Sequence, residues 1–112
     1  PDREAVLRAV EASWSLASST QWRRNNPAAG QCSVTALLLQ ELLGGRLLKT
    51  RVGAAWHFYN QFDAARLDLT ASQFAGPIRY DDEDTNRTEA MGDTSEAQLA
   101  ALRAATLLAL SR

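Results

Sequence analysis

The feature that most constrains the fold is a short, almost wholly apolar segment that ends at two glycines. Its apolar residues occupy most of the circumference of a helix: Val34, Leu37, Leu38, Leu39, Leu42 and Leu43. A helix that is apolar on nearly all sides is stable in water only when other elements surround it. We therefore expect a central, buried helix that begins near Gln31 or Cys32 and ends at Gly44-Gly45.

Weaker patterns on both sides of this segment predict the remaining elements. Residues 2–18 have apolar positions at helical spacing after a possible N-cap, Asp2, and the spacing of Asp93 and Glu96 predicts the start of a last helix with a leucine stripe. Between them we expect extended segments at 47–50 and 78–80, a β-hairpin over 55–70, and a solvated acidic loop over 81–93. This order predicts an α+β fold in a single domain, residues 1–112.

Composition narrows the class of protein. The 112 residues carry 12 basic and 13 acidic groups, so the basic surface of a nucleic-acid-binding protein is not expected. No apolar stretch long enough to cross a membrane and no basic, apolar leader is visible. One Cys and one His exclude an internal disulfide, a cysteine-based zinc finger and a multi-histidine metal site. We expect a cytoplasmic protein without a metal or organic cofactor, and the oligomeric state stays open.

Three side chains occupy positions that suit thiol chemistry. The only cysteine, Cys32, lies at the predicted N-terminus of the central helix, where the helix dipole and free N–H groups favour a thiolate and could bind an oxyanion. The only histidine, His57, lies in the middle of a predicted strand and could move protons. Asp68, on the partner strand, could fix the tautomer of that histidine.

The hairpin register tests whether His57 and Asp68 can meet. With a turn centred on Ala64-Ala65, Asp68 lies opposite Gln61, which shares a face with His57 because side chains alternate along a strand. Asp68 then points to the same face as His57, displaced along the strand. A register change of one residue would move Asp68 to the opposite face.

Each of these residues also has a purely structural interpretation. A lone cysteine is often inert core packing, and a lone strand histidine is often structural. Asp68 could form a local turn with Thr70. The three residues together, each on a suitable element, favour a thiol-based site without excluding these alternatives.

Several blocks of the sequence resemble the YunG-type bacterial proteins. They are NPAAGQCSVTAL at 26–37, Gly44-Gly45, HFYN at 57–60, Asp68-Leu69-Thr70 and Gln73-Phe74, and they span about residues 22–74. The Cys–His–Asp order in turn resembles the papain-like and transglutaminase-like cysteine hydrolases. That resemblance implies a minimal papain-like domain of helices packed on a small antiparallel sheet. It also implies Cys32 as nucleophile, His57 as base and Asp68 as the residue that orients the base.

Four further residues are candidates for binding the oxyanion or substrate. The amide of Asn26 or Gln31 could join the Cys32 backbone N–H in an oxyanion site, although the residues favour the interpretation in which Asn26 shapes the turn and Gln31 caps the helix. Gly30 would allow close approach of a substrate backbone. Trp56 could form a cleft wall or belong to the core.

The leading hypothesis is a cysteine hydrolase that acts on a small amide or peptide-like substrate, with release of the acyl group to water or an amine. A non-catalytic binding module with the same three residues is the alternative. A thiol redox sensor ranks third, because the chain has no second cysteine to resolve an oxidised one. Geometry separates the first two, because catalysis needs the Cys32 sulfur within hydrogen-bond reach of a ring nitrogen of His57 and some access to solvent.

Overall fold

The computed structural model describes residues 2–112 and contains helices and a sheet in the proportions of an α+β protein. Its elements are α1 (Arg3–Ser13), α2 (Cys32–Leu43), β1 (Arg46–Val52), β2 (Ala55–Phe62), β3 (Ala65–Leu67), the 3₁₀ turn η1 (Ala71–Gln73), β4 (Glu83–Asp84), α3 (Arg87–Met91) and α4 (Glu96–Leu110). The predicted α+β class is therefore confirmed.

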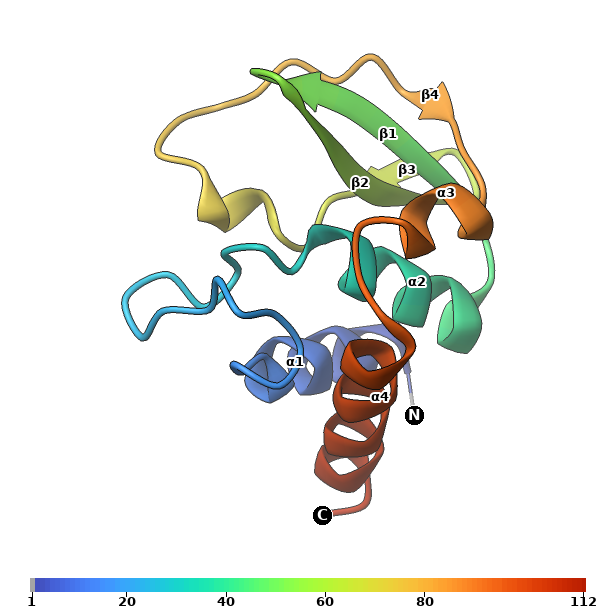
Figure 1. Cartoon of the computed structure of the whole chain (residues 1–112). Helices are drawn as coiled ribbons and strands as arrows, with labels where there is room; N and C mark the ends of the chain where they lie inside the picture. The colour runs from blue at the N-terminus through green and yellow to red at the C-terminus, as the bar shows by residue number, and fades with distance from the viewer. Residues whose placement is uncertain (1) are drawn as a thin grey trace.

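Helix α2 is the centre of the molecule. It lies between the sheet on one side and the packed pair α1 and α4 on the other (Figure 1). Every residue from Cys32 to Leu39 is buried, and Gly44 ends the helix with a positive φ of 79°. The buried amide of Asn60 on β2 donates to the Ala36 carbonyl of α2, 3.0 Å away, and so ties the sheet to the helix. The apolar pattern predicted this central helix and both of its ends correctly.

The four strands form an antiparallel sheet in the order β3-β2-β1-β4. The β2–β3 turn lies at Asp63-Ala64, one residue earlier than predicted, and Asp63 adopts φ 55° there. In the observed register Gln61 pairs with Arg66, so the strands are displaced by two residues from the prediction. A displacement of two residues keeps every side chain on its predicted face. The predicted hairpin was expected to run to residue 70, but its second strand, β3, ends at Leu67 and a turn follows.

Three other boundaries differ from the sequence-based expectations. Helix α1 ends at Ser13, and the indole of Trp14 then donates to Thr35 on α2 at 2.9 Å. Helix α4 is capped by Ser95 rather than Asp93, because the Ser95 hydroxyl accepts from the Gln98 N–H at 3.1 Å. No strand forms at 78–80. At the first two boundaries a side-chain hydrogen bond outweighs the local pattern.

The acidic segment 81–93 is not an unstructured loop. It contains β4, which pairs with Leu48 and Lys49 of β1, and the short helix α3. The Asn86 side chain caps α3 by accepting from the Glu89 N–H at 2.8 Å. Few of its side chains are buried, so the segment lacks the apolar periodicity that would have predicted these elements. Within residues 2–112, no helix has the length and apolarity required to span a membrane.

Candidate active site

Three separate parts of the fold bring the predicted site residues together. Cys32 is the first residue of α2, and Gln31 before it takes the N-cap position. His57 lies on β2, the strand that packs on α2, and Asp68 follows β3 directly. The last β2–β3 pair is Asn60 with Leu67, so the same register extended by one residue places Asp68 opposite Tyr59. Asp68 is then a diagonal neighbour of His57 on the same face of the sheet.

His57 and Asp68 form a buried pair. The ring Nε2 lies 2.7 Å from Asp68 Oδ2, and the two side chains are only 3% and 5% exposed. A carboxylate can only accept, so Nε2 carries the proton that it donates. Asp68 also accepts from the Tyr80 hydroxyl at 2.7 Å and from the Thr70 hydroxyl at 3.4 Å. These bonds fix the carboxylate and, through it, the plane of the histidine ring.

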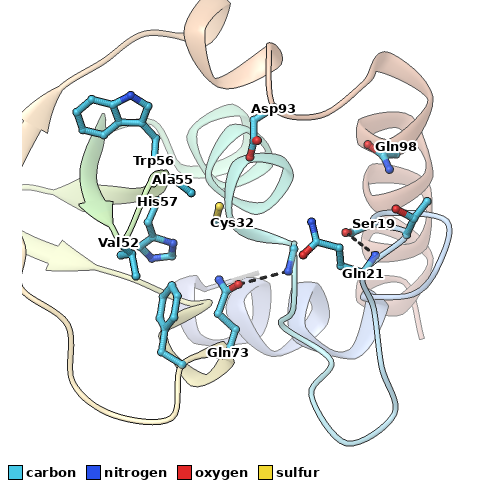
Figure 2. Close-up of a pocket in the computed structure, with 13 residues that line it drawn as sticks. Ser19, Gln21, Cys32, Val52, Ala55, Trp56, His57, Gln73, Asp93 and Gln98 are labelled. Atoms are coloured by element: carbon cyan, nitrogen blue, oxygen red, sulfur yellow. Dashed lines mark hydrogen bonds between the residues drawn. The ribbon is translucent and has the colours of Figure 1, made fainter.

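Cys32 lies against the histidine ring at the edge of a pocket. Its sulfur and the ring face one another in Figure 2, and Cys32 retains 9% of its surface. Because Nε2 is committed to Asp68, the nitrogen left to interact with the thiol is Nδ1. Burial, the largest single influence, lowers the pKa of His57, but hydrogen bonds and charge from Asp68 and Cys32 together raise it to about 9. The site therefore favours an imidazolium beside the sulfur.

The raised pKa of His57 predicts a pH-dependent stability. In the unfolded chain the imidazole has a pKa of about 6.5. Below that pH both states are protonated and the pairing contributes fully. As the pH rises toward the folded value of about 9, the unfolded chain releases its proton first and the contribution is lost. The free energy of unfolding of the native chain, relative to His57→Gln, should fall by on the order of 3 kcal/mol between about pH 6 and pH 9.5. Urea unfolding at both pH values measures this, and a constant or rising difference would contradict it.

The pocket beside Cys32 has a volume of about 260 Å³. Its walls come from the α1–α2 connection, α2, the β1–β2 hairpin, η1 and the start of α4. The lining residues are Ser19, Thr20, Gln21, Gly30, Cys32, Val52, Ala55, Trp56, His57, Gln73, Phe74, Asp93 and Gln98. The volume suits a small ligand or one segment of a peptide.

Two of the predicted oxyanion residues make hydrogen bonds elsewhere. The Asn26 amide donates to the Gln73 carbonyl at 3.1 Å, and Asn26 does not line the pocket. The Gln31 amide nitrogen donates to the Ser15 carbonyl at 3.3 Å, while its buried Oε1 has no partner among the described residues. Both amide nitrogens are thus engaged in holding the α1–α2 connection.

The other two predicted binding residues do line the pocket. Gly30 has φ 72°, and a Cβ there would lie 2.4 Å from Ser19 Oγ, so only glycine fits without rearrangement. Trp56 is half-buried, and Lys49 and Arg51 of β1 place their charged groups 4.1 Å and 4.4 Å from its ring centroid. These contacts fix the indole as one wall of the pocket.

Comparison with known proteins identifies the family. The family model described as YunG protein matches residues 2–111. The chain belongs to the YunG protein family. The relative named "Uncharacterized protein YunG", from Bacillus subtilis (strain 168), is 44% identical over 102 residues, which cover 91% of this chain and 89% of that protein. No solved structure matches the chain. The YunG resemblance is confirmed over nearly the whole chain, and the likeness to papain-like hydrolases stays a prediction.

Sequence reasoning missed several site residues of this YunG family member. Tyr80 donates to Asp68 from an irregular segment, and burial together with this bond raises its pKa to about 12, so the phenol stays a donor. Phe74 packs edge-on against the His57 ring, with centroids 4.9 Å apart. Gln73 lines the pocket beside it. Gln73 and Phe74 stood among the blocks that resemble YunG proteins, which was the only available signal.

Among residues 2–112, no group of three or more His, Cys, Asp and Glu side chains is arranged to hold a metal ion.

Proposed function

We propose that this YunG family member is a small cysteine hydrolase or acyltransferase of the papain-like kind, acting on an amide or peptide-like bond. The observation that carries the proposal is the meeting of the only cysteine and the only histidine in one pocket, with the histidine held by a buried carboxylate at 2.7 Å. Such a nucleophile, base and orienting group form the minimum needed for covalent acyl transfer.

The proposed reaction begins from a thiolate and an imidazolium. The raised pKa of His57 supports this pair, because a protonated ring at neutral pH stabilises an adjacent thiolate. The Cys32 sulfur attacks the carbonyl carbon, and the electron pair of the C=O bond moves to oxygen. When the C–N bond breaks, His57 gives its proton to the leaving amine and a thioester remains on Cys32.

The second half of the reaction releases the acyl group. His57, now neutral, accepts a proton from an incoming water or amine as that nucleophile attacks the thioester. The C–S bond breaks and restores the thiolate beside the imidazolium. Asp68 accepts from Nε2–H throughout, so Nδ1 remains the nitrogen that exchanges protons with the reactants.

The alkylation rate of Cys32 against pH tests the thiol–histidine pair. Because Cys32 is the only cysteine, iodoacetamide reports on this thiol alone. We expect rapid reaction below about pH 7, and a roughly tenfold slower reaction in His57→Ala near pH 6, because loss of the imidazolium returns the sulfur to the neutral thiol. The rate profile of the variant should be displaced to higher pH than the profile of the native chain.

Phe62→Leu is a suitable control variant, because Phe62 is a buried residue of the same strand that lies outside the pocket. Its pH profile should match that of the unmodified protein. An inert Cys32, or an ordinary thiol profile in both the native chain and His57→Ala, would contradict the proposal and favour the non-catalytic binding module.

A further inference from the structure

Gln73 lies in the same pocket as Cys32 and His57, and its position is fixed by contacts on both sides. It is the last residue of η1, and the next residue, Phe74, packs against the His57 ring. Its main-chain carbonyl accepts from the Asn26 amide at 3.1 Å. The short turn is thereby fastened both to the histidine and to the α1–α2 connection.

The orientation of the Gln73 amide follows from its one side-chain hydrogen bond. Oε1 accepts from the backbone N–H of Gly30 at 3.3 Å. A backbone N–H can only donate, so the oxygen must face Gly30 and the amide nitrogen must point the other way. Figure 2 places that nitrogen on the side of the His57 ring and the Cys32 sulfur.

The amide nitrogen of Gln73 has no partner in the described residues. Nε2 is buried and makes no hydrogen bond. An unpaired buried donor is destabilising, so native proteins seldom keep one without a use. Here the donor lies on the side of His57 and Cys32, in a residue that lines the pocket, and a bound ligand can supply the missing acceptor.

We propose that Gln73 Nε2–H stabilises the oxyanion formed when Cys32 adds to the substrate carbonyl. This inference rests on the proposed function and adds a catalytic residue to it. The second donor would come from the N-terminus of α2, whose first N–H groups lack intrahelical acceptors. Gln73 thus takes the role for which Asn26 and Gln31 were candidates, since both of those amide nitrogens donate to backbone carbonyls elsewhere.

Comparing acylation with alkylation tests this role. With p-nitrophenyl acetate, the Cys32 sulfur forms a C–S bond, the carbonyl oxygen becomes an oxyanion, and collapse expels p-nitrophenolate. Alkylation by iodoacetamide displaces iodide at a saturated carbon and forms no oxyanion. Removing one oxyanion donor should slow only the first reaction, by about 10²–10³-fold. We therefore expect Gln73→Met, which keeps length and neutrality, to lose acylation while its alkylation pH profile stays unchanged.

Gln61→Met is the matched control, because Gln61 lies on β2 outside the pocket and its amide is hydrogen-bonded to Arg46 and to the Asp63 carbonyl in an exposed position. It should keep both rates within about threefold, well short of a lost oxyanion donor. Equal acylation by the native chain and Gln73→Met, or equal losses of acylation and alkylation in Gln73→Met, would overturn the role of Gln73. A loss of acylation in Gln61→Met as large as that in Gln73→Met would overturn it too. A native chain that acylates no faster than Cys32→Ala would instead overturn the proposed function, and the Gln73 role with it.

Discussion

Replacement of Cys32 by alanine should abolish turnover of p-nitrophenyl acetate and of fluorogenic peptide amides, lowering kcat by at least about 1,000-fold. No other thiol in the chain can take over the attack, because Cys32 is the only cysteine. The substitution removes one sulfur atom at the pocket edge, so the fold should persist. Steady-state kinetics and thermal unfolding followed by circular dichroism measure both outcomes.

Ser33→Ala provides the control for this experiment. Ser33 is the next residue of α2 and is also buried, but it does not line the pocket, and its hydroxyl donates to the Asp93 carbonyl at 3.4 Å. Its turnover should remain close to that of the native chain. Full turnover in Cys32→Ala, or unfolding of that variant, would remove the case for a nucleophile and assign Cys32 to packing.

Asp68→Asn should lower the free energy of unfolding by about 3 kcal/mol or more, the cost of breaking a buried charge pair. The Asp68 carboxylate accepts from His57, Tyr80 and Thr70 in a site with 5% exposure. An amide presents one NH₂ group toward these donors, so at least one of them loses its acceptor, and the imidazolium loses its counter-charge. Urea unfolding near neutral pH measures the loss.

Asp82→Asn is the matched comparison. Asp82 likewise accepts from a tyrosine, Tyr59, and pairs with a cation, Arg66, but its side chain is 41% exposed. Water compensates for a lost charge there, so the expected cost is at most about 1 kcal/mol. Asparagine also tolerates the φ of 52° at this position. Similar losses in the two variants would show that burial of Asp68 has no special role.

Local sequence patterns were sufficient to predict part of the candidate site. The helix boundary placed Cys32 correctly, because an apolar segment and a glycine stop define α2 without reference to the rest of the fold. The face shared by His57 and Asp68 depended only on strand alternation, and alternation is insensitive to the two-residue displacement of the turn. The distance between them was beyond prediction, because it depends on sheet twist and on the chain leaving β3 at Leu67.

The remaining site residues depend on contacts distant in sequence. Tyr80 reaches Asp68 from a segment without periodicity, and Gln73 meets Gly30 across 43 positions of the chain. The orientation of the Gln73 amide, the basis of its proposed role, is set by that single backbone N–H. No pattern in the neighbouring residues encodes such a bond.

The sequence by itself determined that α2 is buried, that the fold is α+β, and that Cys32 begins the central helix, because these follow from apolar burial and backbone stops that act over a few residues. Only the tertiary structure decided that His57 is buried between Asp68 and Cys32. It also decided that β4 and α3 form in the acidic segment, and that Gln73, which lines the pocket, keeps an unpaired buried donor. Each of these depends on the three-dimensional packing of segments far apart in the chain, where hydrogen bonds and burial outweigh local preference.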